Sequence, residues 1–221
     1  MDNLLHIKLN DFDAAIFDMD GTMINNMLYH QEAWIEFAKR HGLGELTEEE
    51  FKEKFAGRKN DQLVQMIFNK ELSADEILMY SEEKEGLYRE LYRSYIKEVA
   101  GLSEILHLLK VNNKKLAIAT TAPKKNREFG LEALKIVDTF SVILGDEDVT
   151  KGKPDPEIYL ETAKRLGVET SRCLVFEDTP SGVGAGKNAR MTVIGIMTTH
   201  SAKDLKEADF HVKDFTYIKF D

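Results

Sequence analysis

The stretch AIFDMDGTM, residues 15–23, decides the fold that we expect for this chain. Its apolar start is typical of a strand that helices cover on both faces, and the strand ends in two acids, Asp18 and Asp20. In open parallel sheets, ligands bind beyond the carboxyl ends of the strands. Two carboxylates one residue apart repel each other unless they hold a cation, and Mg²⁺ prefers such oxygen ligands. By itself the pattern also fits a turn in which both acids accept bonds from nearby backbone groups.

Working outward, short apolar runs alternate with helical stretches along most of the chain. The expected strands are Ala14–Asp18, Lys115–Thr120, Val142–Gly145, Cys173–Glu177, Thr192–Ile196 and Phe210–Val212. From Leu46 to about Val99, however, the spacing of apolar residues is helical throughout. The alternation predicts an α/β fold with a parallel-sheet core, interrupted after its first strand by an α-helical insertion. We expect residues 1–25 and 98–221 to form the core and residues 26–97 to form the helical domain.

The composition is that of a soluble globular protein. The chain has 221 residues, of which 43% are hydrophobic and 31% are charged, and no apolar run approaches the roughly 20 residues of a membrane span. A formal net charge of −9 argues against nucleic acid or an anionic membrane as a partner, because both favour a basic surface. The single cysteine, Cys173, and the lack of a signal-peptide pattern predict a cytoplasmic location. We expect a monomer.

A second acidic strand end follows in CLVFEDTPSGVGAG, residues 173–186. Glu177 and Asp178 are adjacent acids, and such a pair is costly without a counter-ion. Two acidic strand ends from distant segments favour one shared metal site. The small residues between Gly182 and Gly186 would let the following helix approach the sheet closely.

Two further motifs carry groups that suit a phosphate. In TKGKPDPEIY, residues 150–159, Lys153 precedes a proline and a predicted helix start. A lysine held there would offer a compact positive charge to a phosphate oxygen, and a solvated surface role is the alternative. In LAIATTAP, residues 116–123, a strand ends in Thr120 and Thr121. Hydroxyl and backbone N–H groups at a strand end can bind phosphoryl oxygens.

The order of these motifs resembles that of the haloacid dehalogenase superfamily, in the branch with a helical cap inserted after the first strand. FDMDGT at Phe17–Thr22, Thr120, Lys153 with KPDP, and FEDTPSGVGAG at Phe176–Gly186 look like all four motifs of that family. The resemblance covers essentially the whole chain and extends to β-phosphoglucomutase and its phosphatase relatives. It implies a Rossmann-like core with a helical cap that closes over the site and selects the leaving group.

The resemblance implies a Mg²⁺-dependent phosphatase that hydrolyses a small phosphorylated metabolite, with a sugar phosphate as the expected substrate. Asp18 would be the nucleophile that forms an aspartyl phosphate, and Asp20 would be the general acid and base. Asp18, the backbone carbonyl of Asp20 and Asp178 would bind Mg²⁺. Glu177 would act on the metal through water.

The resemblance also implies phosphate and substrate contacts. Thr120, Thr121 and Lys153 would hold phosphoryl oxygens. In the cap, His30 of LYHQEAW falls where relatives carry a histidine, and Lys84 of EEKEGLY looks like the lysine that senses the substrate. Both would otherwise be ordinary helical side chains.

The sequence departs from the family pattern in two places. Asn25 and Asn26 stand where the family usually has Asp followed by Ser or Thr, which bears on the hydrogen bonds that orient the catalytic acid. The mutase's phosphate-binding cap arginine and polar loop correspond to Gly57–Asp61 and Thr121–Asn126, which do not match residue for residue. Arg58 could still bind an anion of the substrate by another geometry.

Three alternatives stay open. The first is a β-phosphoglucomutase that interconverts β-glucose 1-phosphate and glucose 6-phosphate. The second is a non-catalytic phosphate-binding module, although binding alone has no need of the pair Asp18 and Asp20. The third is a lysine-dependent phosphonate hydrolase with Lys84 as the Schiff base, and the charged surroundings of Lys84 in the sequence predict no burial that would lower its pKa. A P-loop motif is absent from the sequence, which argues against a nucleotide-hydrolysing switch.

Overall fold

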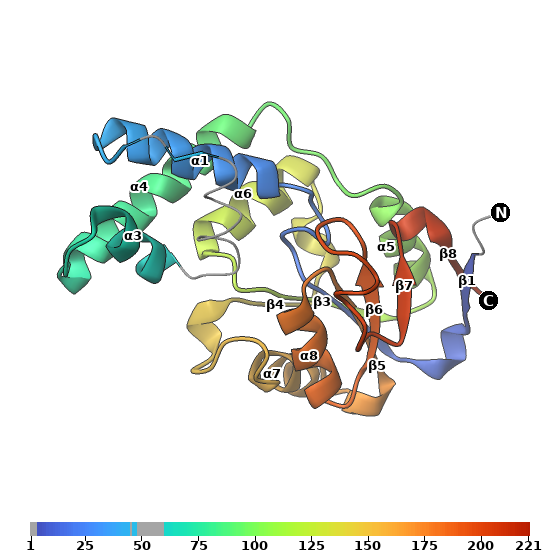
Figure 1. The fold of residues 1–221 in the computed structure, drawn as a ribbon. Helices are drawn as coiled ribbons and strands as arrows, with labels where there is room; N and C mark the ends of the chain where they lie inside the picture. The colour runs from blue at the N-terminus through green and yellow to red at the C-terminus, as the bar shows by residue number, and fades with distance from the viewer. Residues whose placement is uncertain (1–3, 45, 48–59) are drawn as a thin grey trace. The chain divides into compact units, whose positions relative to one another are not determined.

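The structure is a computed structural model that describes residues 4–44, 46–47 and 60–221. The chain divides into two compact units, one of residues 1–25 and 96–221 and one of residues 26–95. The first is an α/β unit and the second is helical (Figure 1).

A six-stranded parallel sheet lies at the centre of the α/β unit, among the described residues. In sheet order its strands are β4 (Val142–Leu144), β3 (Lys115–Ala119), β2 (Ala14–Phe17), β5 (Cys173–Glu177), β6 (Thr192–Ile196) and β7 (Phe210–Val212). Phe17 of β2 pairs with Ile118 of β3 and with Phe176 of β5. This register brings the segments that follow β2, β3 and β5 to one edge of the sheet.

Helices lie against both faces of this sheet (Figure 1). The unit contains α5 (Leu102–Val111), α6 (Lys124–Leu134), α7 (Glu157–Leu166) and α8 (Pro180–Asn188), with 3₁₀ turns η1 (Leu9–Asp11), η2 (Val137–Thr139), η3 (Asp146–Asp148), η4 (Thr170–Arg172) and η5 (Phe215–Tyr217). α7 contacts β2, β3 and β4, α8 contacts β5 and β6, and α5 contacts β3 and η5.

Successive side chains of the central strands point to opposite faces. Ile16 and Val175 join the apolar core formed with α7 and α8. Their neighbours Phe17 and Phe176 face the other way, where the two rings stack with centroids 4.6 Å apart. Because both faces are covered, all four residues of β2 are buried, which explains its continuous apolar run.

A second, two-stranded parallel sheet joins the ends of the chain. β1 (Leu5–Ile7) pairs with β8 (Ile218–Phe220), and Figure 1 shows these two strands side by side. A bond of 2.7 Å between His6 and Asp221 adds to this contact. Neither strand was predicted from the sequence, and their pairing joins segments more than 200 residues apart, which no local pattern reveals.

The helical unit consists of α1 (Met27–Arg40), α3 (Asn60–Phe68) and α4 (Ala74–Tyr92) in the residues that the structure describes. α4 begins with a capping box in which Ser73 and Glu76 bond each other's backbone N–H groups. Trp34 and Phe37 of α1 and Tyr88 of α4 are buried between the helices. Within the described ranges, the helices are too short or too polar to cross a membrane.

The predicted fold class is confirmed, and the six predicted strands agree with the structure to within one residue. The differences lie at carboxyl ends: β2 ends at Phe17, β3 at Ala119 and β4 at Leu144, each one residue earlier than predicted. Asp18 and Thr120 instead begin the loops in which the functional groups lie.

Gly186 tests how closely α8 lies against the sheet. A Cβ at Gly186 would be 2.7 Å from Cγ2 of Val193 in β6, so we expect Gly186→Ala to destabilise the protein by about 1–3 kcal/mol through overpacking. The same substitution at Gly86 of α4 meets Nη2 of Arg89 at an ordinary 3.9 Å. Helix propensity should then stabilise Gly86→Ala by about 0.5–1 kcal/mol. Urea unfolding measures both changes, and equal stability of the two variants would contradict the close packing.

Candidate active site

Three carboxylates lie together at the carboxyl ends of β2 and β5. Asp18 follows β2, Glu177 ends β5 and Asp178 follows it. One carboxylate oxygen of each residue lies within 4.8 Å of the others, and all three residues are buried. The N–H of Asp18 donates to the carbonyl of Phe176 at 3.0 Å, which continues the strand pairing up to the site. The two acidic strand ends of the sequence therefore form one cluster.

The electrostatics of this cluster favour a cation. Burial raises the pKa of Asp18 well above its ordinary value; the charge of Lys153 opposes this, and Glu177 and Asp178 add to it. Burial and then the charge of Glu177 raise the pKa of Asp178 to about 7. The raised pKa values show that the ionised forms of Asp18 and Asp178 are costly with Lys153 as the neighbouring positive charge, and a further cation would favour those ionised forms. Because the donors of the cluster are oxygens, the donor set fits a hard divalent cation such as Mg²⁺.

Lys153 links the carboxylates. Its Nζ donates to Oδ1 of Asp18 and to Oε1 of Glu177, both at 2.6 Å, and to the carbonyl of Ala119 at 3.1 Å. Burial by itself lowers the pKa of Lys153, but the charges of Asp18 and Glu177 outweigh it and hold that pKa well above its usual value. The ammonium is therefore a permanent charge where β2, β3 and β5 end.

Glu177 is surrounded by donors of the protein. Oε1 accepts from Lys153 and, at 2.9 Å, from the hydroxyl of Tyr159 in α7. Oε2 accepts from the N–H groups of Asp178 and Thr179 at 3.0 and 3.2 Å, and from the Thr179 hydroxyl at 3.1 Å. A Cβ at Gly182 would lie 1.8 Å from Oε1, so only a glycine leaves room for this carboxylate.

Asp178 is oriented by hydroxyls from two loops. Thr22 donates to Oδ1 at 3.0 Å, and Thr199, in the loop after β6, donates to Oδ2. Gly21 approaches so closely that a Cβ there would lie 2.1 Å from Oδ2, and its φ of +81° also favours glycine. Thr198, which precedes Thr199 in the loop after β6, donates to the carbonyl of Gly21.

The remaining core residues that we predicted lie in the neighbouring loops. Asp20 is partly buried in the loop after β2. Thr120 is 1% exposed at the end of β3, and its hydroxyl oxygen accepts from the N–H of Ala122 at 3.1 Å, so its own proton remains for another acceptor. Thr121 is exposed.

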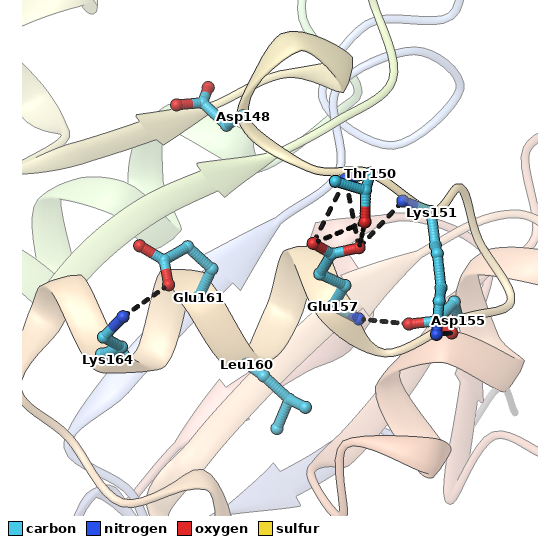
Figure 2. A pocket seen from close by; sticks show the side chains of 8 residues that line it. All are labelled: Asp148, Thr150, Lys151, Asp155, Glu157, Leu160, Glu161 and Lys164. Atoms are coloured by element: carbon cyan, nitrogen blue, oxygen red, sulfur yellow. Dashed lines mark hydrogen bonds and ion pairs between the residues drawn. The ribbon is translucent and has the colours of Figure 1, made fainter.

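A surface pocket of about 420 Å³ lies elsewhere on this unit (Figure 2). It is lined by Asp148, Thr150, Lys151, Asp155, Glu157, Leu160, Glu161 and Lys164, none of which is a predicted site residue. Its carboxylates already bind groups of the chain; Glu157, for example, accepts from the N–H groups of Thr150 and Lys151. The buried carboxylate cluster, and not this pocket, carries the candidate active site.

In the helical unit, Lys84 is buried, and our expectation that it lies in unburied, charged surroundings is wrong. It is 1% exposed, and its Nζ lies 2.5 Å from Oε1 of Glu85 and 3.2 Å from Nδ1 of His30. The ammonium also lies 5.1 Å from the centre of the Trp34 ring. The charged residues around Lys84 in the sequence hide the fact that this face of α4 packs on α1. Arg58 lies outside the described residues.

Asn26, at the start of α1, belongs to the same polar cluster. Its amide donates to the hydroxyl of Tyr88 at 2.6 Å and lies 3.4 Å from Nε2 of His30, whereas Asn25 is exposed. His30 stacks on Tyr88 with ring centroids 3.8 Å apart. Burial, and then the charge of Lys84, lowers the pKa of His30 to about 3. The imidazole is therefore neutral at ordinary pH.

Comparison with known proteins identifies the family. Residues 15–196 match the family model described as haloacid dehalogenase-like hydrolase. The chain belongs to this family. Validoxylamine A 7′-phosphate phosphatase of Streptomyces hygroscopicus subsp. limoneus is 32% identical over 95% of this chain and 97% of its own length. β-Phosphoglucomutase of Bacillus subtilis is 28% identical over 83% of this chain and 82% of its own.

The solved structure of a haloacid dehalogenase hydrolase, family IA, variant 3, from Entamoeba histolytica matches this chain with a TM-score of 0.87. It is 37% identical and covers 94% of this chain and 96% of its own. These findings confirm the resemblance, the α/β fold with flanking helices and the enzyme class that the sequence predicted. Relatives of this haloacid dehalogenase-like hydrolase include a phosphatase and a β-phosphoglucomutase.

Several residues that surround the hydrolase's carboxylates were not predicted. Thr198 and Thr199 follow β6, so the rule that polar residues gather at carboxyl ends of strands could have indicated them. Thr22 lies inside the first motif, but its hydrogen bond to Asp178 was not predicted. Tyr159 lies within α7 and carries no sequence signal, because its partner Glu177 is 18 residues away.

Removing the Lys153 charge should destabilise the hydrolase. Lys153→Met leaves Asp18 and Glu177 buried without their counter-charge, and we expect a loss of about 3–5 kcal/mol in the free energy of unfolding at neutral pH. Lys151, two residues away and 69% exposed, is the matched control, and Lys151→Met should change little. Chemical unfolding measures both, and a loss at position 153 no larger than at position 151 would contradict the structural role of the ammonium.

The partly buried, neutral His30 should make the protein sensitive to acid. The unfolded chain takes up a proton near the ordinary pKa of 6.5, whereas folded His30 does so only near about 3. Its contribution to stability is therefore complete above pH 6.5 and is lost as the pH falls towards 3, by at most about 1.4 kcal/mol per pH unit. Between pH 6.5 and 3, the free energy of unfolding should fall less steeply in His30→Asn than in wild type. His107→Asn, at an exposed site, should show the same pH dependence as wild type. An NMR titration of His30 near pH 6.5 would contradict this.

Proposed function

We propose that this chain is a Mg²⁺-dependent phosphatase that hydrolyses a small phosphorylated metabolite, a sugar phosphate, through an aspartyl-phosphate intermediate. The observation that carries this proposal is the buried cluster of Asp18, Lys153, Glu177 and Asp178 at the carboxyl ends of β2 and β5. A carboxylate nucleophile and a fixed ammonium in one buried place suit phosphoryl transfer, which depends on positioning and charge stabilisation.

Asp18 attacks the phosphorus atom with one carboxylate oxygen, and the bond between phosphorus and the ester oxygen breaks. Asp20 gives its proton to the leaving oxygen, and then takes a proton from the water that attacks the aspartyl phosphate. Hydrolysis returns the Asp18 carboxylate and releases inorganic phosphate. Two displacements thus replace one difficult displacement.

The Lys153 ammonium and the Thr120 hydroxyl hold phosphoryl oxygens in this scheme. Lys153 already bonds Asp18 at 2.6 Å, so a phosphoryl group that approaches Asp18 also meets the ammonium. Thr120 accepts a bond from Ala122 and keeps its proton for the substrate. Thr121, an exposed residue of the same loop, offers its backbone N–H as a further donor.

Asp18, Asp178 and the backbone carbonyl of Asp20 are the groups that we assign to Mg²⁺. When bound, the ion would supply positive charge that offsets the repulsion between the nucleophile and the phosphoryl oxygens. Asp178 is held for this task by Thr22 and Thr199. For Glu177 we propose a different role from the predicted water-mediated one: its oxygens bind Lys153, Tyr159 and backbone groups, and so orient the ammonium.

We propose that residues 26–97 form a cap domain whose residues His30, Arg58 and Lys84 select the substrate. The buried pair of Lys84 and Glu85 supports a charge that is held in place. A Schiff-base role for Lys84, as in a phosphonate hydrolase, would need a neutral amine, and the ion pair with Glu85 argues against it. A monomeric state, a cytoplasmic location and the lack of a nucleic-acid partner stay predictions.

A β-phosphoglucomutase is the second candidate, because the enzyme of that name from Bacillus subtilis is 28% identical. The phosphatase of Streptomyces hygroscopicus is 32% identical and matches more of both chains, which favours hydrolysis.

A panel of sugar phosphates, nucleotides and pyrophosphate with Mg²⁺ tests the proposal, with free phosphate and rearranged sugar followed together. We expect phosphate release that disappears in Asp18→Asn and when EDTA removes the metal, since the nucleophile and the metal are both required. Glu128→Gln, a change at an exposed residue, is the control that should keep full activity.

The outcomes separate the candidates. Interconversion of β-glucose 1-phosphate and glucose 6-phosphate with little free phosphate would favour the mutase. Binding of phosphate without turnover of any substrate at saturating Mg²⁺ would favour the non-catalytic module. Phosphate release that survives in Asp18→Asn would contradict the covalent mechanism.

A further inference from the structure

A second charged pair, outside the carboxylate cluster, contacts the loop after β3. Arg127 of α6 is 6% exposed. Its Nη1 donates to the carbonyl of Ala122 at 2.7 Å and to Oε2 of Glu147 at 3.0 Å, and its Nη2 donates to Oε1 of Glu147. One planar guanidinium therefore joins the loop after β3 to turn η3, which follows β4.

These bonds hold Ala122 at both of its peptide groups. Its carbonyl accepts from Arg127, and its N–H donates to the hydroxyl oxygen of Thr120 at 3.1 Å. A rotation of the backbone at Ala122 would break both bonds. Because the Thr120 hydroxyl is held through its oxygen, the direction of its remaining proton depends on where Ala122 lies.

Turn η3 is itself held firmly. The N–H of Gly145 donates to Oδ2 of Asp148 at 2.9 Å, and Arg165 of α7 donates to Oδ1 of Asp148 at 3.0 Å. Glu147 therefore projects from a turn that is attached to α7. Through Glu147, the position of the Arg127 guanidinium is tied to the body of the α/β unit.

Gly145 makes the space that the ion pair needs. A Cβ at this position would lie 1.8 Å from Nη1 of Arg127 and 2.3 Å from Oε2 of Glu147. The backbone of Gly145, with φ −122° and ψ −175°, is extended and would accept alanine without strain. A glycine is therefore needed at position 145 to leave room for the guanidinium, and not because of the backbone conformation.

The pair is better suited to positioning than to stability. The Glu147 side chain is 50% exposed, so water screens much of the attraction. A bidentate contact between arginine and a carboxylate nevertheless restricts distance and angle, which a lysine cannot reproduce.

We propose that Arg127 and Glu147 are positioning residues for phosphate binding: they hold Ala122 so that the Thr120 hydroxyl points its proton at a phosphoryl oxygen. This inference rests on the proposed phosphatase function. Neither residue touches the substrate. Loss of the pair should weaken the binding of the phosphoryl group in the ground state and in the transition state by similar amounts. It should therefore raise KM more than it lowers kcat.

Two variants test the pair by different routes. Arg127→Lys keeps the positive charge but loses the two-bond contact with Glu147. Gly145→Ala displaces the guanidinium while Arg127 and Glu147 both remain. The matched control is Arg172→Lys, which removes a bidentate contact of 2.7 and 2.8 Å to Asp13, before the amino end of β2. The measurements are KM and kcat on the best substrate of the panel, the Ki of inorganic phosphate, the Tm, and hydrogen exchange of the Ala122 amide.

We expect both variants to raise KM and the phosphate Ki about tenfold and to speed exchange at Ala122, because small misplacements of a binding group have effects of this order. Arg172→Lys should leave all these values near wild type. Wild-type KM and Ki in folded Arg127→Lys and Gly145→Ala, whatever their Tm, would overturn the proposal and leave a structural ion pair.

Failure of the proposed function is a separate result. A wild-type protein that turns over no phosphate ester would refute the phosphatase. Exchange at Ala122 then decides on the pair, because it needs no turnover: rates equal to wild type in both variants would overturn the inference, and faster rates would support it.

Discussion

The ammonium of Lys153 is the group on which the rest of the site depends. It lies 2.6 Å from Asp18 and from Glu177, which come from two neighbouring strands, and it also bonds the carbonyl that ends β3. Buried carboxylates cost several kcal/mol each unless they are paired and hydrogen-bonded. The parallel register makes such pairing possible, because β2, β3 and β5 end at one level and expose their following residues to the same lysine.

Close approach of backbone to carboxylate is the second constraint. Gly21 lies against Asp178, and Gly182, in the first turn of α8, lies against Glu177, each at a distance that admits no Cβ. Gly145 does the same for the Arg127 guanidinium. In each case a glycine next to a charged group marks a contact that any side chain would prevent. The small residues of the fourth motif therefore serve the carboxylate as well as the packing of α8 on the sheet.

The helical unit is built on different physics. Aromatic rings of α1 and α4 fill its interior, and a small polar cluster lies among them, in which Lys84 and Glu85 are buried and His30 is partly buried. The sequence could not reveal that burial. α4 carries charged residues on most of its turns, and the few that point towards α1 look no different in the sequence from those that point into water. For the same reason the bond between Asn26 and Tyr88 could not be predicted from the sequence.

The sequence by itself determined the sheet, the order of its motifs and the family, because those features are local: an apolar strand followed by acids, threonine or a lysine before proline is visible in a few consecutive residues. It also indicated the groups of the carboxylate cluster, since strand ends in a parallel sheet meet at one edge. Only the tertiary structure decided which groups hold those residues in place. Glu177 is held by Tyr159, Asp178 by Thr199, and the loop after β3 by Arg127. Each contact is a hydrogen bond between separate elements. Such bonds have no period in the sequence, and their partners become neighbours only when helices and loops pack on the sheet.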